Sequence, residues 1–381
     1  MTGDKSSKIR VLRIIARMNI GGPAIQVTTL MNYLPKSEVY QLLITGECEP
    51  GEKDFLEFNR IDLDRMRIPS LGRSINPISD VKALFKIRKA IKIFRPDIVH
   101  THTFKAGLLG RLAALSIRNH PYLVHTFHGH ILNGYLGGAK LAILKTIERL
   151  LALKTDVLVA VGERVMEELK EVGVGKYNKF EVVPPGFPMT RVHSIDTNMF
   201  SSNPKNLKCA WVGRFVEVKA PQRILEVARI ISKNKSQVQF LVAGDGPLRN
   251  KIQEQSELEG LAVKFFGWTA DIQNFLKDVD LLFLTSINEG TPIAIIESQR
   301  LGKPVIATDV GSVSETISHG KSGYAIDYDP LRFAQILESF ANDRIKLREF
   351  SEESIRFAGD KFSPERLSSD YLRIYKSLIS T

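Results

Sequence analysis

Residues 281–308, LLFL-TSINEGTP-IAIIESQR-LGKP-VIAT, carry the pattern from which we predict the fold of the chain. The apolar run Leu281–Leu284 predicts a short buried strand, and Val305–Ala307 predicts a second one. Between them, Thr291 is a competent N-cap and Pro292 suits the first position of a helix, which a Gly-Lys-Pro break ends. A strand, turn, helix and strand in this order predict one unit of a parallel α/β sheet.

Two glutamates stand in this unit, Glu289 on the turn and Glu297 in the helix. Eight residues of helix span about 12 Å, so the two carboxylates can accept hydroxyl hydrogen bonds from different parts of one long ligand. The turn adds free backbone N–H groups and the positive end of a helix dipole, which suit an anion. Taken alone, the two residues are more simply explained as a solvated turn glutamate and an ordinary helix glutamate, and the rest of the chain reverses that preference.

The composition is that of a globular protein. The chain has 381 residues, 43% hydrophobic and 25% charged, which predicts two or three domains. Its two cysteines, Cys48 and Cys209, exclude a disulfide framework and a cysteine-rich zinc site, and they fit a reducing cytoplasm. Residues 1–22 lack the uninterrupted apolar core of a signal peptide, and no run of 18 apolar residues predicts a transmembrane helix. We therefore expect a cytoplasmic protein.

The net charge of +11 is distributed unevenly. Residues 1–190 hold 28 Lys and Arg against 18 Asp and Glu, whereas the charges nearly cancel in residues 191–381. A basic half favours an anionic partner, which is a nucleic acid, an anionic membrane surface or a phosphorylated substrate. No nucleic-acid recognition module is visible, so we expect no nucleic-acid partner.

A basic amphipathic helix is predicted over residues 80–95. Its apolar stripe at helical spacing includes Val81, Leu84, Ile91 and Phe94, and its lysines lie off that stripe. The helix either lies on an anionic membrane or exposes a solvated face opposite a core stripe.

The first strand, predicted over Lys8–Ala16, leads into a glycine turn, Asn19-Ile20-Gly21-Gly22-Pro23-Ala24, and a helix. Gly21 and Gly22 have the pattern of a phosphate cradle and, equally, of an ordinary tight turn. The turn is neither GxGxxG nor a Walker loop, because no Lys-Ser/Thr follows the glycines. An irregular polar section is predicted from the end of the next strand, at Thr45, to Arg73.

Six of the eight histidines lie between His100 and His130. No cysteine and few acids accompany them, and no His-x3-His helix pair occurs, so they do not indicate zinc. They fall at the ends of two predicted parallel strands, 97–100 and 122–126, where open α/β sheets bind ligands. We predict a sugar or phosphate site there. The glycine-rich apolar loop at 131–138 either dips into lipid or covers an acceptor, or is a buried connection.

A second alternation of strands and helices begins at Cys209, after a polar segment at 187–208 that is the best candidate for a linker. Two successive βαβα runs predict the α/β fold class, with two doubly wound Rossmann-like domains and a cleft between them. We assign residues 1–187 to an N-terminal domain, joined by the C-terminal helix at about 364–381, and residues 188–363 to a C-terminal domain.

Two cations follow the first strand of the C-terminal domain, in Gly213-Arg214-Phe215-Val216-Glu217-Val218-Lys219. Arg214 can bind a diphosphate with two parallel bonds, and Lys219 can add a point charge. As an isolated pair they would be surface charges, and their predicted place at the carboxyl end of a strand favours a ligand site.

The order and spacing of these motifs resemble the retaining, nucleotide-sugar-dependent glycosyltransferases of the GT-B fold, in particular glycosyltransferase family 4 of bacterial polysaccharide and glycan biosynthesis. The resemblance covers nearly the whole chain. Besides the motifs above, it rests on Ala243-Gly244-Asp245-Gly246-Pro247 and on His125-Thr126-Phe127-His128-Gly129-His130. It implies an acceptor-side N-terminal domain and a donor-binding C-terminal domain.

The resemblance implies a metal-independent, retaining hexosyltransferase that needs no cofactor and uses a nucleotide-sugar donor. Arg214 and Lys219 would hold the donor diphosphate, Glu297 the ribose and Glu289 the sugar, which His128 would touch from the other domain. The implied catalytic residues are His128, Arg214, Lys219 and Glu289. The implied donor-binding residues are Gly21, Gly22, Gly213, Arg214, Lys219, Gly244, Gly267, Trp268, Glu289, Gly290, Thr291, Pro292, Ile293 and Glu297.

Two fixed cations and a helix N-terminus are preorganised to stabilise charge on a departing diphosphate, so the chemistry needs no metal. Three Asp-x-Asp pairs occur, at 62–64, 278–280 and 327–329, and a pattern this short arises often by chance. Pro185 stands where many relatives carry Asn, and Thr291 stands where some carry an aromatic residue, so contacts made by those residues do not transfer to this chain.

The expected function is transfer of a hexose or N-acetylhexosamine from a UDP-sugar to a glycan or polyprenyl-diphosphate-linked acceptor in cell-surface polysaccharide biosynthesis. The expected place is the cytoplasm, on the inner face of the plasma membrane. The alternatives are a sugar-nucleotide epimerase of the same architecture and a non-catalytic nucleotide-sugar sensor.

Overall fold

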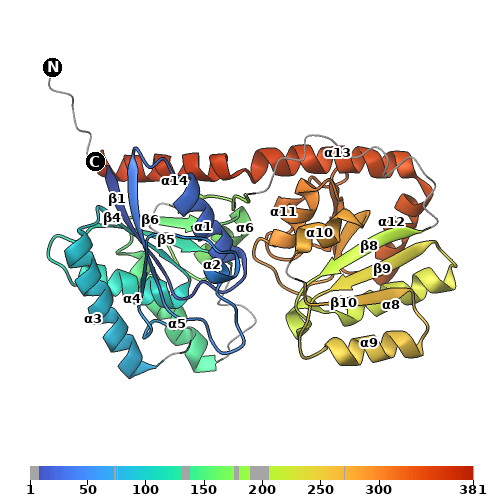
Figure 1. Ribbon diagram of the computed structural model, residues 1–381, viewed down its shortest axis with the longest axis horizontal. Coiled ribbons are helices and arrows are strands. Elements are labelled where there is room, and N and C mark those ends of the chain that lie inside the picture. Colours follow the sequence, from blue (N-terminus) through green and yellow to red (C-terminus); the bar gives the residue numbers. More distant parts are fainter. Residues whose placement is uncertain are drawn as a thin grey trace, which may run out of the picture. The chain divides into compact units, whose positions relative to one another are not determined.

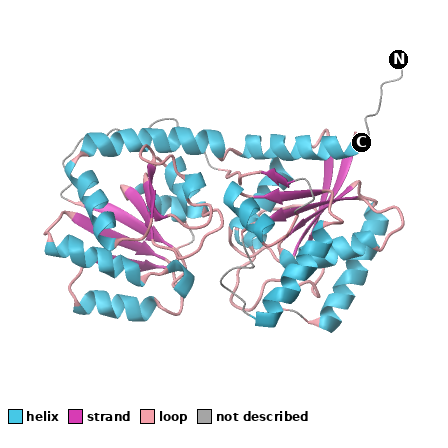
Figure 2. Cartoon of the chain, turned by 180° about the vertical axis from the view of Figure 1, so that it is seen from behind, coloured by secondary structure: helices cyan, strands magenta, loops and turns pink. Residues whose placement is uncertain are grey.

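The computed structural model describes residues 8–72, 74, 76–129, 138–175, 180–188, 206–269 and 271–380. The chain divides into two compact units, Met1–Pro188 with Ser363–Thr381 (unit 1) and Met189–Phe362 (unit 2). Each unit is a parallel sheet covered by helices on both faces, as Figures 1 and 2 show from opposite sides. The two predicted Rossmann-like domains are therefore confirmed.

The described part of unit 1 forms a sheet of parallel strands in the order β3-β2-β1-β4-β5-β6-β7. The strands are β1 (Ile9–Ile15), β2 (Val39–Thr45), β3 (Arg65–Arg67), β4 (Ile98–His102), β5 (Tyr122–Phe127), β6 (Val157–Ala160) and β7 (Phe180–Val182). The helices are α1 (Gly22–Tyr33), α2 (Phe55–Phe58), α3 (Pro77–Phe94), α4 (Phe104–Leu115), α5 (Gly138–Ala152), α6 (Glu163–Glu171) and α14 (Pro364–Ile379). One face of the sheet packs on α3 and α4, and α1 and α14 cover the other.

The described part of unit 2 forms a second parallel sheet, in the order β10-β9-β8-β11-β12-β13. The strands are β8 (Leu207–Val212), β9 (Val238–Ala243), β10 (Val263–Gly267), β11 (Leu281–Leu284), β12 (Val305–Thr308) and β13 (Gly323–Ile326). The helices are α8 (Gln222–Lys233), α9 (Arg249–Leu258), α10 (Ile272–Lys277), α11 (Ile293–Arg300), α12 (Pro330–Asn342) and α13 (Arg344–Lys361), with the short 3-10 turns η1 (Glu217–Lys219) and η2 (Ser314–Thr316).

Both sheets reverse their strand order at the first strand, between β1 and β4 in unit 1 and between β8 and β11 in unit 2. Chains that leave neighbouring strands in opposite directions open a crevice at the carboxyl ends, where such folds bind ligands. The switch points thus locate one candidate edge in each unit.

The C-terminal helix α14 belongs to unit 1 by its contacts. Arg366 in its first turn donates to the carbonyl oxygens of Pro184 at 2.6 Å and Pro185 at 3.0 Å. Leu367 and Tyr371 are fully buried against the sheet of that unit. The last helix of the chain therefore completes the core of the first unit.

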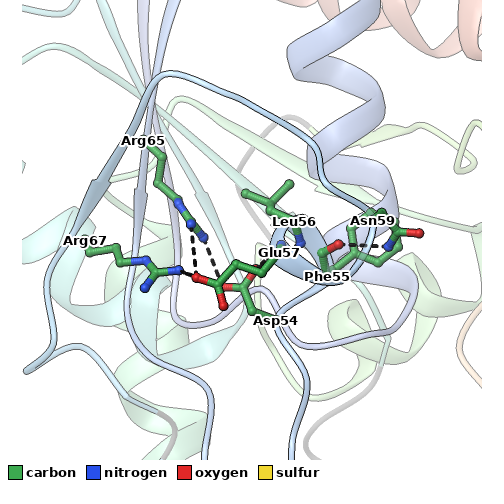
Figure 3. A network of polar contacts seen from close by, with 7 residues as sticks. All are labelled: Asp54, Phe55, Leu56, Glu57, Asn59, Arg65 and Arg67. Atoms are coloured by element: carbon green, nitrogen blue, oxygen red, sulfur yellow. Dashed lines mark hydrogen bonds and ion pairs between the residues drawn. The ribbon is translucent and has the colours of Figure 1, made fainter.

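The polar section that we predicted to be irregular up to Arg73 contains two elements, α2 and the edge strand β3, so that prediction was wrong. Asp54 caps α2 by accepting from the backbone N–H of Leu56 at 2.9 Å, and Arg65 donates to its other oxygen at 3.0 Å. Arg67 pairs with Glu57 beside it (Figure 3). These ion pairs, which alternation of apolar residues does not signal, hold the section onto the edge of the sheet.

Two smaller predictions were also wrong. Helix α11 begins at Ile293 with Pro292 at the N-cap position, so Thr291 does not cap it. In α3, Ile91 and Phe94 are buried as predicted, but Val81 is 53% exposed, because the buried stripe passes through smaller residues such as Ala83.

Some predictions lie outside the described residues. They are His130, the apolar loop 131–138 apart from residue 138, and most of the predicted linker 187–208.

Candidate functional site

The loops that follow β8, β9 and β10 are tied together at the carboxyl edge of the unit 2 sheet. The N–H of Gly213 donates to Ala243 at 3.1 Å, and the N–H of Gly244 donates to Gly267 at 2.7 Å. Gly244 has φ +143°, and a Cβ built there would lie 1.8 Å from the carbonyl oxygen of Gly213. Only glycine allows these loops to approach so closely.

Lys219 and Glu289 meet at the switch point of unit 2. Lys219 lies in η1 after β8, Glu289 lies on the turn after β11, and their side chains form an ion pair. Ser286 donates to the same carboxylate oxygen, Oε1, at 2.6 Å. Glu289 is thus held by two partners, and one of them is the lysine that we predicted to bind the diphosphate.

The backbone of the two loops holds this pair in place. The N–H of Ile287 donates to the carbonyl of Val218 at 2.8 Å. The hydroxyl of Thr285 donates to the carbonyl of Lys219 at 3.2 Å and accepts a bond from the indole of Trp211, also 3.2 Å. Buried hydrogen bonds therefore fix the backbone of the two loops that carry the Lys219 and Glu289 side chains.

Gly311, after β12, is a further close approach that the sequence predictions missed. Its φ is +55°, and a Cβ there would lie 1.6 Å from the carbonyl oxygen of Glu289. The N–H of Ser312 donates to the carbonyl of Gly290 at 3.3 Å. The available signal was a glycine four residues after the predicted buried strand Val305–Ala307.

The other predicted residues of unit 2 lie on the same edge. Arg214 is exposed directly after β8, and Trp268 is 47% exposed after β10. Gly290, Thr291 and Pro292 form the approach to α11, and Ile293 is its first residue. All of these positions follow strand ends, so the edge presents cations, backbone N–H groups and a carboxylate together.

Glu297 lies in α11, one turn after its start, and no described residue forms an ion pair or hydrogen bond with its carboxyl group. Burial raises the pKa of this carboxyl group to about 7, since burial disfavours the charged form. A half-buried carboxyl group without a partner is expensive in a folded protein, which makes it a candidate for a ligand contact.

In unit 1, Gly21 and Gly22 follow β1 and begin α1. Gly21 is the N-cap, and its carbonyl accepts from the N–H of Ile25. Among the described residues, a Cβ at Gly21 would meet no atom closer than 4.0 Å, so no close contact with them requires this glycine.

We had predicted that the histidines lie at the carboxyl ends of the strands, and this is wrong for some of them. Strand β4 extends to His102, so His100 lies inside the sheet and His102 is the last residue of its strand, and His125 lies inside β5. All three are buried, with 1% exposure or less, and burial lowers their pKa values well below 6.5. Of the predicted set, His128 follows a strand end and is partly exposed. No cluster suited to a metal ion occurs among the described residues.

The structure thus joins Lys219 to Glu289 and links the glycine loops beside them. It places Arg214, Trp268 and Glu297 on the same edge, and in the described part of the chain none of the three forms a hydrogen bond or ion pair with Lys219 or Glu289. Gly21, Gly22 and His128 belong to unit 1.

Two family models match the chain, and they meet near the boundary between unit 1 and unit 2 at residue 188. Residues 20–191 match the family model "Glycosyltransferase Family 4", and residues 195–357 match "Glycosyl transferases group 1".

Similar proteins include bacterial glycosyltransferases. A galactosyltransferase of Escherichia coli, UDP-Gal:alpha-D-GlcNAc-diphosphoundecaprenol alpha-1,3-galactosyltransferase, is 28% identical over 89% of this chain and 89% of its own. The capsular polysaccharide biosynthesis glycosyltransferase CapM of Staphylococcus aureus is 24% identical over 86% of this chain and 88% of its own. Among solved structures, Anabaena HepE in complex with UDP and glucose has a TM-score of 0.75 at 18% identity, covering 97% of this chain and 100% of that one.

Proposed function

The chain belongs to the glycosyltransferases of the two-domain GT-B fold, and we propose that it moves a hexose or N-acetylhexosamine from a UDP-sugar to a lipid-linked glycan, with retention. The observation that carries the proposal is the Lys219–Glu289 ion pair at the switch point of unit 2. A nucleotide-sugar donor offers both an anionic diphosphate and a row of hydroxyl groups. Lys219 supplies the charge for the first, and Glu289 the acceptor for the second.

Charge on the departing diphosphate is the main electrostatic problem of this reaction. Lys219 and the exposed Arg214 supply two cations, and the approach to α11 supplies backbone N–H groups. Groups already fixed before the reaction stabilise developing charge without reorganisation, so we propose that the chain needs no metal. Donor binding displaces Lys219 from Glu289, which frees one oxygen of the carboxylate for a sugar hydroxyl.

The donor and acceptor are proposed from the relatives. The Escherichia coli relative is named for a UDP-sugar donor, a diphosphoundecaprenol-linked acceptor and an alpha linkage, and the solved HepE structure contains UDP. These names support a UDP donor, a polyprenyl-diphosphate acceptor and a role in polysaccharide biosynthesis for this chain.

A thermal-shift screen of UDP, GDP and ADP sugars tests the donor. We expect UDP-sugars to raise the melting temperature, since binding to the native state alone stabilises it. A shift with none of the UDP-sugars would contradict the proposal.

Glu297 predicts a pH-dependent donor affinity. Its pKa of about 7 means that the carboxyl group is largely protonated at pH 6 and ionised at pH 8. An ionised carboxylate accepts hydroxyl bonds more strongly, so the affinity for a UDP-sugar should rise about tenfold between these pH values. A UDP-sugar is the right probe because both ends of its diphosphate are esterified, so the ligand itself does not titrate there.

Calorimetric titrations at several pH values measure this effect. Glu297→Gln should flatten the profile, whereas Glu254→Gln on the exposed face of α9 should keep it. A wild-type affinity that is constant from pH 6 to pH 8 would show that Glu297 does not bind the ribose.

We also propose that α3 lies on an anionic membrane surface. Four large apolar side chains of this helix are exposed: Ile78, Val81, Phe85 and Ile93. Four lysines share the same exposed face at steps of three or four residues: Lys82, Lys86, Lys89 and Lys92. The opposite face packs on α4 and the sheet (Figure 1). Apolar side chains interleaved with lysines suit lipid headgroups, and the membrane would bring the enzyme to a lipid-linked acceptor.

Vesicle sedimentation tests this surface. Replacing the four lysines by Gln should lower binding to phosphatidylglycerol vesicles at least tenfold, because each lysine near the surface contributes about 1 kcal/mol. The matched control carries the same charge change in unit 2, at the exposed Lys233, Lys235, Lys251 and Lys264. Equal loss in both variants, or binding that is independent of salt, would refute a specific role of α3. No helix among the described residues is long and apolar enough to cross a membrane.

A further inference from the structure

One face of the unit 1 sheet carries a row of buried polar side chains beneath α14. Arg13 in β1 is paired in register with His100 in β4, and His102 in β4 with Thr126 in β5. Because paired residues of parallel strands share a face, these side chains line up across the sheet. All four are fully buried, beside the apolar residues of β1, β4 and α14 that form the core on this face.

Arg13 is a buried cation that forms no ion pair with any carboxylate in the described part of the chain. Its guanidinium nitrogens meet neutral groups: His100 Nδ1 at 2.7 Å, His102 Nε2 at 3.3 Å, Gln41 Oε1 at 2.7 Å and the Tyr375 hydroxyl at 3.2 Å. Burying a charge without a counter-charge costs folding free energy. An expensive arrangement of this kind, next to a candidate ligand site, calls for a role.

An arginine can only donate, so the ring nitrogens that face it must accept. Burial lowers the pKa of His102 well below 6.5, so its ring is neutral and carries one proton. Since Nε2 accepts from Arg13, that proton is on Nδ1. This Nδ1–H lies 2.9 Å from Nε2 of His128 and donates to it.

The same reasoning continues to His128. Burial lowers its pKa to about 3, so this ring is neutral as well. Its Nε2 accepts from His102, so its own proton is on Nδ1. His100 has the opposite tautomer, because its Nδ1 faces Arg13 and its Nε2 lies 2.8 Å from the hydroxyl of Thr126. One arginine therefore sets two neighbouring histidines in different tautomers.

We propose that Arg13 and His102 are positioning residues that hold His128 in the Nδ1–H tautomer, so that His128 offers a ligand a hydrogen-bond donor and not a basic nitrogen. The ligand is a sugar if the proposed function is right, and this part rests on it. His128 then binds a hydroxyl oxygen of the sugar and takes no proton from it. Removing a residue that orients a ligand-binding histidine in this way lowers activity about ten- to a hundredfold.

Nitrogen NMR of the ligand-free protein tests the tautomers directly. With 15N-labelled histidine, long-range 1H–15N spectra distinguish the Nδ1–H, Nε2–H and doubly protonated rings, and His128→Asn assigns the signals of that ring. We expect Nδ1–H for His102 and His128, and Nε2–H for His100, at pH 7. An Nε2–H or doubly protonated His128 in the wild-type protein would overturn the proposal.

Two polar variants of His102 separate positioning from packing. In His102→Asn the amide lies where Nδ1 was and still donates to His128. In His102→Gln the amide lies where Nε2 was, so it meets Arg13 and leaves His128 without a donor. We expect His128 to keep the Nδ1–H tautomer in the Asn variant, and to turn at least partly to Nε2–H in the Gln variant.

Turnover should follow the tautomer. For a UDP-sugar that the wild-type protein uses, kcat/KM of the Gln variant should lie about tenfold below that of the Asn variant. If both variants fold and His128 has the same tautomer in the two, or their kcat/KM values are equal, His102 does not position His128. If the wild-type protein has the predicted tautomers but uses no sugar nucleotide, the proposed function is rejected while the positioning of His128 by Arg13 and His102 is supported. Failure of the proposed function can therefore be distinguished from failure of this inference.

Discussion

Lys219→Ala is expected to lower kcat for sugar transfer about a thousandfold. The variant removes a preorganised cation from the place where charge develops, and loss of one such donor costs a hundred- to a thousandfold. It also leaves Glu289 without its ion-pair partner, facing the diphosphate with a negative charge. Both effects act in the same direction, so we place the loss at the upper end. UDP release at saturating donor and acceptor measures it.

The matched control is Lys251→Ala, which removes an exposed lysine of α9 in the same unit. Its kcat should equal that of the wild-type protein. The double variant Lys219→Ala with Glu289→Gln isolates the electrostatic part, because it removes both charges together. It should bind UDP more tightly than Lys219→Ala alone. Equal UDP affinity in the single and double variants would contradict a repulsive Glu289.

Glu289→Gln is expected to weaken the contact with the sugar, and so to lower turnover, without weakening the binding of the nucleotide. The amide keeps the shape of the side chain, but it loses the negative charge that accepts a sugar hydroxyl most strongly. We expect kcat to fall about a hundredfold. The affinity for UDP should stay constant or rise, because Lys219 no longer has to leave an ion pair to bind the phosphates.

Calorimetry with UDP, combined with turnover of the UDP-sugar, measures the two effects. Glu254→Gln, the same change on an exposed helix face, serves as the control. A parallel loss of UDP affinity and turnover in Glu289→Gln would mean that the carboxylate supports the loop and does not contact the sugar.

Strand and helix periodicity predicted most of the fold because buried parallel strands are apolar runs between turn residues. Leu281–Leu284 lies within the core with 4% exposure or less and forms β11 as predicted. Strand β13 and helix α12 have no counterpart in the predictions. The signal for α12 was present, as Asp329 caps it and Phe333, Leu337 and Phe340 are its buried stripe. Strand β13, Gly323–Ile326, begins with glycine and contains a tyrosine, so it is not a continuous aliphatic run like the one at Val305–Ala307.

The candidate site was predictable in its residue types but not in its contacts. Lys219 and Glu289 were both named from motifs, yet their pairing depends on β8 and β11 being neighbours in the sheet. Gly311 was missed because its need for glycine comes from Glu289, a residue distant in sequence. The histidines were placed at strand ends because polar residues seldom lie in buried strands. Hydrogen bonds with Arg13 satisfy His100 and His102 there, and a bond with Thr101 satisfies His125. A linear pattern does not reveal such partners.

The measurement that tests the account most directly is the anomeric configuration of the product. The purified protein is given a UDP-α-hexose and a polyprenyl-diphosphate-linked N-acetylglucosamine, and the new glycosidic bond is examined by proton NMR. We predict release of UDP and an α-linked disaccharide, which means transfer with retention. A β-linked product would contradict the retaining mechanism, and an epimerised free sugar nucleotide with no glycosidic bond would contradict the transferase.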